Sequence, residues 1–267
     1  MDANVNTVNA GRLELRAVSV RYGALTALEE VSIDFPTGVI CGLIGPNGAG
    51  KTTLLNAVSG FTQVSAGSIV VGDVDIARFD IRERVALGVV RGFQTPRLLE
   101  QETVRTNVAV GCEPLGHPSV VVQLANLPAQ RRAEARDALY VDEALGLLDL
   151  QEVASRRVDQ LPFATRRLVE VARVLVARPR IVLLDEPAAG LDADDRDALA
   201  TVIRRVHDER AMTVVIVEHN VEFVRLLCQH VVALDYGRVI SRGDADAVLA
   251  DEAVRLAYFG VSHNVAS

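Results

Sequence analysis

Apolar and polar residues alternate or run together in short stretches that predict strands in the first part of the chain. Val31, Ile33 and Phe35 are separated by single polar residues, as in a half-buried strand. Residues 39–44 (VICGLI) form a short apolar run, which is typical of a buried parallel strand. Residues 68–76 (SIVVGDVDI) return to strand character. These runs predict an N-terminal region rich in β structure.

Helical spacing replaces the strand pattern in the middle of the chain. Residues 129–150 predict one helix, and its expected apolar face is Leu139, Ala144, Leu145 and Leu148. Residues 165–177 predict a second helix, with apolar positions i, i+3, i+4 and i+7 at Leu168, Val171, Ala172 and Leu175. No Gly/Ser-rich linker sets this part off. We therefore expect a helical insertion at about residues 96–165 within one domain.

The last third alternates between the two patterns. Strand-like runs at 181–184, 212–217 and 231–235 are separated by helix-like runs at 195–209 and 221–228. Such alternation favours a parallel sheet covered by helices, an α/β fold.

The length fits one large domain. The 267 residues are 49% hydrophobic, enough for a substantial core. We expect a single domain over residues 11–260, with tails at 1–10 and 261–267.

The composition narrows the classes of partner. A net charge of −7 argues against a nucleic-acid partner. Three cysteines without metal or disulfide spacing, Cys41, Cys112 and Cys228, suit a reducing compartment. The polar N-terminus lacks a signal core, and no apolar run is long enough to cross a bilayer. We expect a soluble chain that another protein would have to hold at a membrane.

A glycine-rich loop follows the apolar strand at 39–44 and precedes a predicted helix. It contains Gly45-x4-Gly50-Lys51-Thr52, in the strand–loop–helix setting that a phosphate-binding P-loop requires. Backbone amides and the helix N-terminus would face the phosphates, Lys51 would lie near the terminal ones, and Thr52 would offer a hydroxyl to Mg²⁺. Lys51 is the only lysine beside 27 arginines. A glycine-rich turn without a ligand is the alternative.

Two carboxylates and a histidine follow further apolar runs. Asp185 and Glu186 end the run at 181–184, where ligands of α/β sheets bind. Asp185 would hold Mg²⁺ through water and Glu186 would polarise an attacking water, although a plain acidic turn is the alternative. His219 follows the run at 212–217 and could contact the γ-phosphate, or be an ordinary satisfied histidine. Gln94 lies in a loop before the helical part.

Together these residues resemble the ATP-binding subunit of ABC transporters over nearly the whole chain. In that resemblance Tyr22 matches the aromatic residue that stacks on adenine, and Gln94 matches the residue that couples the site to the membrane subunit. Asp185 and Glu186 match the Walker B pair, and His219 matches the switch histidine. The D-loop is matched by AAGLD, which ends at Asp192. The Walker A loop is matched by Gly45, Pro46, Asn47, Gly48, Ala49, Gly50, Lys51, Thr52 and Thr53.

The resemblance carries expectations about fold and activity. It implies a P-loop NTPase with an N-terminal antiparallel β subdomain, a RecA-like parallel core and an inserted helical subdomain. It implies an ATPase that uses ATP and Mg²⁺. Glu186, His219, Lys51 and Gln94 would take part in catalysis, and the metal would be held by Thr52, Gln94 and Asp185. Asp192, in the stretch that matches the D-loop, would belong to the nucleotide-binding residues.

Partners and substrate are implied in the same way. Residues 86–108 (ALGVVRGFQTPRLLEQETVRTNV) and the ending VRLAYFG look like subunits of branched-chain amino acid importers, strings that importers of amides and urea share. The family works as two ATP-binding subunits on paired transmembrane permease subunits at the cytoplasmic face, with an external solute-binding protein for importers. Each ATP lies between the P-loop of one subunit and the signature loop of the other.

The signature itself departs from the family pattern, Leu-Ser-Gly-Gly-Gln. The matching positions are Leu161, Pro162, Phe163, Ala164 and Thr165. Proline has neither hydroxyl nor amide hydrogen, and a methyl group at Ala164 would hinder close approach or exclude a positive φ. We therefore favour a heterodimer in which this chain's own nucleotide is hydrolysed. The alternatives are a working homodimer, a regulatory subunit with weak hydrolysis, or an ABC ATPase for another substrate.

Overall fold

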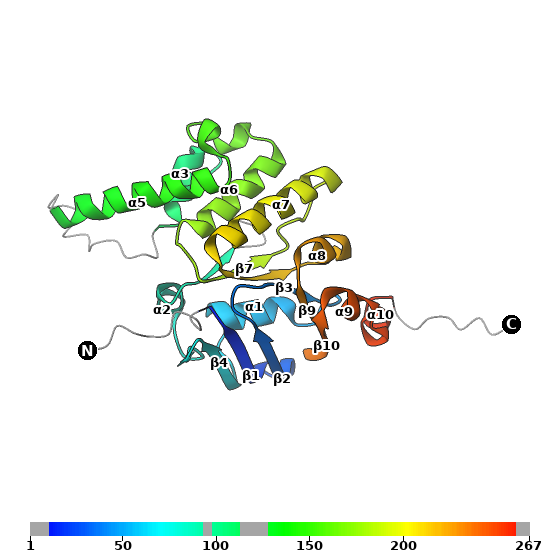
Figure 1. Cartoon of the computed structure of the whole chain (residues 1–267). Coiled ribbons are helices and arrows are strands. Elements are labelled where there is room, and N and C mark those ends of the chain that lie inside the picture. The colour runs from blue at the N-terminus through cyan, green and yellow to red at the C-terminus, as the bar shows by residue number, and fades with distance from the viewer. Residues whose placement is uncertain (1–10, 93–97, 113–127, 260–267) are drawn as a thin grey trace.

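The computed structural model describes residues 11–92, 98–112 and 128–259. Two sheets and a set of helices form layers. Helices α3 (Val104–Val110), α5 (Pro128–Leu147) and α6 (Phe163–Leu175) lie at one end of the molecule and the antiparallel sheet lies at the other (Figure 1). The antiparallel sheet has the order β2-β1-β4-β5. Its strands are β1 (Leu13–Tyr22), β2 (Leu25–Phe35), β4 (Ala66–Val71) and β5 (Val74–Asp75). The expected strand over 68–76 is thus two strands, because Gly72, at φ +60°, turns the chain between them.

The second sheet has the order β10-β9-β3-β8-β7-β6. All its neighbouring strands are parallel except β10 and β9, which are antiparallel. Its strands are β3 (Ile40–Ile44), β6 (Val89–Gly92), β7 (Ile181–Asp185), β8 (Thr213–Val217), β9 (His230–Asp235) and β10 (Arg238–Asp244). This confirms the predicted parallel sheet.

Helices connect the strands and cover the parallel sheet. They are α1 (Lys51–Ser59), α2 (Ile81–Ala86), α3 (Val104–Val110), α5 (Pro128–Leu147), α6 (Phe163–Leu175), α7 (Ala193–Arg210), α8 (Val221–Leu227), α9 (Ala245–Ala250) and α10 (Glu252–Phe259). Two short 3-10 helices, Gln151–Val153 and Val158–Gln160, precede α6. An isolated bridge between Thr103 and Arg157 joins the two sides of this helical part.

The core has two halves that meet at the parallel sheet. In β7, Ile181 and Leu183 pack with α1 and the antiparallel sheet, whereas Val182 and Leu184 pack with the helices on the opposite face. This alternation follows from the period of two along a strand. Helix α1 therefore lies between the two sheets, which holds the end of the preceding loop in a fixed place.

One predicted helix face needs correction. The buried positions are Val141, Ala144 and Leu145 in α5 and Leu148 in the turn that follows it, whereas Leu139 in α5 is 68% exposed. The buried set has the spacing i, i+3, i+4, i+7, and Leu139 does not fit it. The predicted stripe of α6 is confirmed, since Val171, Ala172 and Leu175 are buried and Leu168 packs against them.

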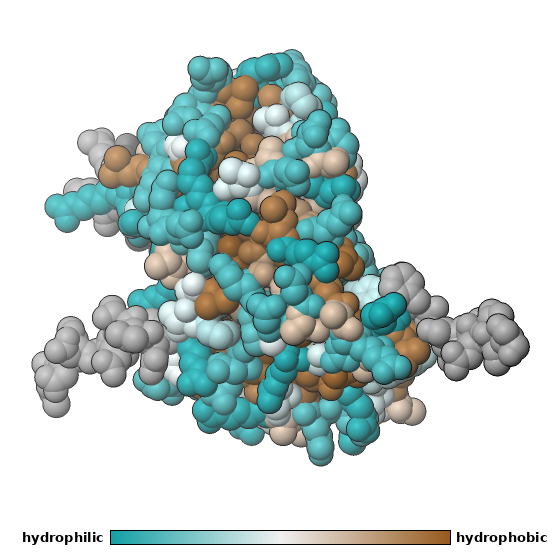
Figure 2. Space-filling model, turned by 45° about the vertical axis from the view of Figure 1, so that its right-hand side comes forward, coloured by the Kyte–Doolittle hydropathy of each residue, from teal (hydrophilic) through white to brown (hydrophobic). Residues whose placement is uncertain are grey.

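One face of the molecule is mostly hydrophilic. Figure 2 shows this face, with apolar side chains gathered near its middle. Among the described residues no helix is both long and apolar enough to span a membrane. Cys41, Cys112 and Cys228 are buried free thiols.

Candidate functional site

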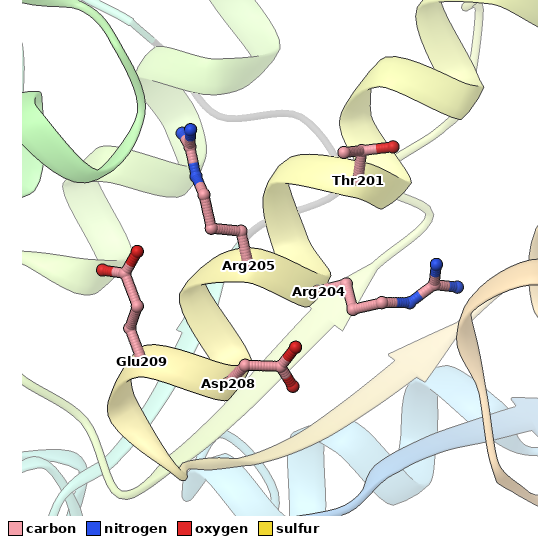
Figure 3. Close-up of a pocket in the computed structure, with 5 residues that line it drawn as sticks. All are labelled: Thr201, Arg204, Arg205, Asp208 and Glu209. Atoms are coloured by element: carbon pink, nitrogen blue, oxygen red, sulfur yellow. The ribbon is translucent and has the colours of Figure 1, made fainter.

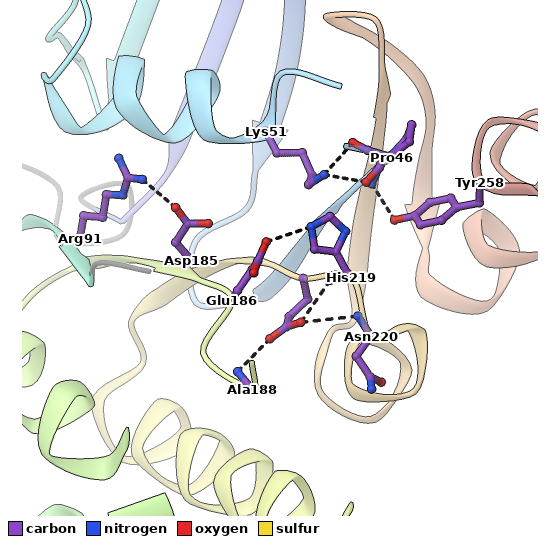
Figure 4. A network of polar contacts seen from close by, with 11 residues as sticks. Pro46, Lys51, Arg91, Asp185, Glu186, Ala188, His219, Asn220 and Tyr258 are labelled. Atoms are coloured by element: carbon purple, nitrogen blue, oxygen red, sulfur yellow. Dashed lines mark hydrogen bonds and ion pairs between the residues drawn. The ribbon is translucent and has the colours of Figure 1, made fainter. Parts of the chain in front are cut away.

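The carboxyl ends of three neighbouring strands converge on the glycine-rich loop. Leu43 of β3 and Asp185 of β7 both pair with Val217 of β8. The loop after β3 therefore begins beside Glu186 and His219, which follow the ends of β7 and β8. Figure 4 shows these side chains facing Lys51 and Pro46.

The loop requires glycine where its backbone passes closest to the sheet. Gly45 has φ +150°, and a Cβ atom there would lie 2.2 Å from the carbonyl oxygen of Leu234. Its N–H donates to the hydroxyl of Tyr258 at 2.8 Å. This contact joins the loop to α10, although the two residues are 213 positions apart in the sequence. The tight curl at Gly45 leaves no room for a side chain there, as in a backbone cradle for phosphate.

Lys51 begins helix α1 and is buried. Its ammonium donates to the carbonyl oxygens of Gly45 at 2.6 Å and Pro46 at 2.9 Å. Burial lowers the pKa of Lys51, and the charges of Glu186 and Asp185 act in the opposite direction. The helix has Gly50 as its N-cap, with no side-chain cap and no acidic residue in its first turn. Its first amides and its dipole are thus available to an anion.

Asp185 is bound by an arginine that the sequence analysis did not identify. Arg91 Nη2 lies 2.7 Å from Asp185 Oδ2, and the two side chains are 8% and 2% exposed. The same guanidinium donates to the side chain of Asn56 in α1 and lies 6.0 Å from the ring centre of Phe61. Arg91 therefore joins β6, β7 and α1 at the base of the site.

Glu186 and His219 form a second pair, 2.9 Å apart between Oε1 and Nε2. Glu186 has φ +51°, a left-handed conformation that is uncommon outside glycine. Its N–H nevertheless donates to the carbonyl oxygen of Val217 at 2.9 Å. The strained turn directs its side chain toward His219, an arrangement that recurs at functional sites.

Other predicted residues lie around this centre. Thr52 is exposed in the first turn of α1. Tyr22 is 49% exposed at the end of β1, and its hydroxyl lies 3.0 Å from Thr62 Oγ1. Asp192 caps α7 by accepting from the N–H of Asp195 at 2.9 Å. Gln94 lies outside the described residues.

The residues that differ from the family signature lie at the start of helix α6. Pro162 is its N-cap, and Phe163 is 50% exposed beneath the guanidinium of Arg167, 5.0 Å from its ring centre. Ala164 lies within α6 and is not among the residues with positive φ. The methyl group there consequently conflicts with no positive φ, contrary to one of the two expectations for this position.

The donors fit a magnesium nucleotide better than a bare metal. No group of three or more His, Cys, Asp or Glu side chains that could hold a metal occurs in the described chain. Mg²⁺ commonly takes only one or two protein oxygens, together with water and phosphate. The hydroxyl of Thr52 could supply one such oxygen beside the open amides of α1, and the carboxylate of Asp185 could hold the ion through water.

A surface hollow elsewhere does not belong to this centre. It measures about 450 Å³ and lies along α7, lined by Thr201, Arg204, Arg205, Asp208 and Glu209 (Figure 3). Both of its arginines already have partners: Arg204 donates to the carbonyl oxygen of Leu226 and Arg205 to the carboxylate of Asp149.

Comparison with known proteins gives a consistent picture. The family profile described as ABC transporter matches residues 28–189. The high-affinity branched-chain amino acid transport ATP-binding protein BraF of Pseudomonas aeruginosa is 33% identical over 93% of this chain and 97% of its own. The sulfate/thiosulfate import ATP-binding protein CysA of Bordetella parapertussis is 37% identical over 92% of this chain and 66% of its own.

Solved structures resemble the same fold. A nucleotide-free ATP-binding cassette from an ABC transporter superposes with a TM-score of 0.80 at 27% identity, covering 93% of this chain and 99% of the other. The ADP conformation of an ATP-binding cassette of an ABC transporter gives a TM-score of 0.80 at 27% identity, over 93% and 98% of the two chains.

Proposed function

The chain belongs to the ABC transporter family as an ATP-binding ATPase subunit that uses ATP and Mg²⁺, and from this premise we propose which transport it drives and how its residues contribute. The substrate we propose is branched-chain amino acids or related small polar solutes. BraF, similar over nearly its full length, supports this choice. CysA, more identical over a smaller share of its length, shows that likeness alone leaves the solute open.

The convergence of Lys51, at the start of α1, with Glu186 and His219, which follow adjacent strands, carries the proposed chemistry. Lys51 and the amides of α1 would hold the phosphates and stabilise the charge that develops during phosphoryl transfer. Thr52 would offer its hydroxyl to Mg²⁺ and Asp185 would hold the ion through water; when bound, the ion neutralises phosphate charge. Gln94 would be a further ligand of the Mg²⁺ ion and would couple the nucleotide site to the membrane subunit.

Glu186 and His219 would act on the attacking water. The carboxylate of Glu186 would orient the water and accept its proton, while His219 holds that carboxylate at 2.9 Å. Tyr22 would stack on the adenine, since its ring is half exposed at the edge of the β1–β2 hairpin. That hairpin also borders the loop, because Ala27 and Leu28 lie against Gly50.

We further propose that the chain works beside a second, different ATP-binding subunit. This chain's nucleotide would meet the partner's signature, and the partner's nucleotide would meet Leu161–Thr165. The start of α6 offers open amides but no serine hydroxyl, and Phe163 is exposed where that helix begins. Slow turnover at the partner's site would follow. The pair would bind permease subunits at the cytoplasmic face of the membrane, and a solute-binding protein would deliver the substrate.

One experiment tests this function. ATP turnover by the purified chain is measured over a range of protein concentrations, alone and with a candidate partner subunit, using Glu186→Gln as the blank. We expect ATP binding by the chain alone, and turnover that requires the partner. Appreciable turnover alone that rises steeply with concentration would instead indicate a competent homodimer and remove the asymmetric assignment.

A variant of the assembled complex identifies the working site. Glu186→Gln in this chain is expected to abolish most of the turnover, because its own site is the hydrolysing one. Activity that survives this change would place hydrolysis at the partner's site.

A further inference from the structure

A second buried carboxylate lies beneath the site and has no part in the chemistry proposed above. Glu218 follows β8 directly and is 3% exposed. The pKa of Glu218 is raised, mainly by burial and also by the nearby charge of Glu186. The hydrogen bonds that its carboxylate accepts from backbone N–H groups act in the opposite direction. A buried carboxylate is costly unless its oxygens are hydrogen-bonded, so its contacts indicate what it stabilises.

The contacts of Glu218 join two loops that are distant in sequence. Oε1 accepts from the N–H of Ala188 at 2.9 Å. Oε2 accepts from the N–H of His219 at 3.1 Å and lies 3.5 Å from the N atom of Asn220. Figure 4 shows Ala188 and Asn220 on opposite sides of this carboxylate network. One side chain thus holds the loop after β7 with one oxygen and the loop after β8 with the other.

Both loops carry proposed site residues. The loop after β7 begins at Glu186 and continues to Asp192, the stretch that resembles the D-loop facing a partner subunit. The loop after β8 carries His219. The contact between Glu186 and His219 is a second link between the two loops, and it lies on the more exposed side of the site.

We propose that Glu218 is a positioning residue that fixes the His219 loop and the 187–192 segment to each other, so that the two loops move as one unit. The inference rests on the proposed ATPase function. In a two-subunit assembly, the unit would transmit the state of this chain's nucleotide from His219 to the segment that faces the partner. Glu218 itself touches neither nucleotide nor water in this scheme.

The substitution Glu218→Gln separates this role from simple burial. Glutamine keeps the size of the side chain but has one oxygen and one NH₂ group, and NH₂ cannot accept a hydrogen bond. One of the two loops must then lose its acceptor. We expect kcat to fall about tenfold or more, as for residues that orient a site from behind, while the Kd for ATP stays within about twofold.

Thr213→Val is the matched control. Thr213 starts the same strand, is fully buried, and its hydroxyl donates to the carbonyl oxygen of Gly11 at 2.6 Å. Removing that hydroxyl should lower the melting temperature without changing kcat. Equal kcat for Glu218→Gln and wild type would overturn the proposal. All kcat values are measured in the assembly with the partner subunit. Absence of wild-type turnover above the Glu186→Gln blank in that assembly would instead remove the proposed function, and this inference with it.

A double-mutant cycle tests whether Glu218 acts through His219. If it does, Glu218→Gln added to His219→Ala should lower kcat by less than about twofold beyond His219→Ala alone. Multiplication of the two single effects would show an independent role and contradict the proposal.

Hydrogen exchange on the wild-type chain needs no variant and covers the case in which Glu218→Gln fails to fold. The amides of Ala188 and His219 should exchange at similar rates, because one opening event releases both. Rates that differ by about a hundredfold would show that the loops open separately.

Discussion

His219 Nε2 lies 2.9 Å from Glu186 Oε1. The two residues follow adjacent parallel strands, β8 and β7. Asp185 and Val217 pair at the ends of those strands, so Glu186 and His219 lie one and two residues beyond a shared register point. Glu186 makes this contact while its backbone has φ +51°. A conformation of this kind costs of order 1 kcal/mol and is maintained because the surrounding strands fix it.

Glu186→Gln should lower ATP turnover by about 10²- to 10⁴-fold, because the amide cannot accept a proton from water. ATP binding should remain, since the phosphate contacts proposed for Lys51 and α1 are untouched. Steady-state turnover and equilibrium binding of a fluorescent ATP analogue measure the two effects. Glu222→Gln, an exposed change in the first turn of α8, is the control and should leave both unchanged.

Lys51 should react with amine-directed reagents in a way that reports on the site. It is the only side-chain amine of the chain, and burial lowers its pKa. A lower pKa means a larger fraction of reactive neutral amine at mildly alkaline pH. Mass spectrometry should show labelling of Lys51 that ATP with Mg²⁺ suppresses, while labelling of the chain's α-amino group stays constant. Labelling of Lys51 at the same rate with and without the nucleotide would contradict its place at the phosphates.

Gly45→Ala and Gly48→Ala should differ sharply although both glycines belong to one loop. An added methyl group at Gly45 meets the carbonyl oxygen of Leu234 at 2.2 Å, whereas at Gly48 no atom lies within 4 Å. Gly48→Ala carries only the cost of a left-handed alanine, about 1 kcal/mol. Gly45→Ala adds an overpacking cost of about 1–3 kcal/mol. Urea unfolding of the two variants should reveal this order, and a reversal would count against the loop geometry.

Tyr258→Phe removes the hydroxyl that accepts from the N–H of Gly45. The free energy of unfolding should fall by about 1–2 kcal/mol, the cost of leaving a partly buried donor without its partner. ATP affinity should fall a few fold, because the first amide of the loop loses its anchor. Thermal unfolding and ATP titration measure these effects. Tyr236→Phe is the control, since Tyr236 is 86% exposed, and an equal loss in both variants would argue against the anchor.

The parts of the fold that the sequence predicts are those governed by local spacing. The strand at 39–44, the loop after it and helix α1 follow from one apolar run, a glycine pattern and a helical pattern. Glu186 and His219 come together because they end apolar runs, and parallel strands end at one edge. The face of α5 was predicted with Leu139 in place of Val141, because several apolar residues in that helix allow more than one stripe.

The contacts that the sequence does not reveal join residues far apart in the chain. Tyr258 lies 213 residues from Gly45, and no local pattern relates them. Arg91 belongs to a strand of only four residues, too short to give a clear periodic signal. Glu218 stands beside His219 in the sequence, but its value as a hydrogen-bond acceptor depends on the path of the loop around Ala188.

The charged groups of the site are already matched within the chain: Lys51 with two carbonyl oxygens, Asp185 with Arg91, and Glu186 with His219. Nucleotide binding is therefore an exchange of partners. Its net free energy is the difference between two satisfied arrangements, which permits release of product as well as capture of substrate. This exchange suits a subunit that must bind and release nucleotide repeatedly. In neither the nucleotide-free nor the nucleotide-bound state is a buried charge left without a partner.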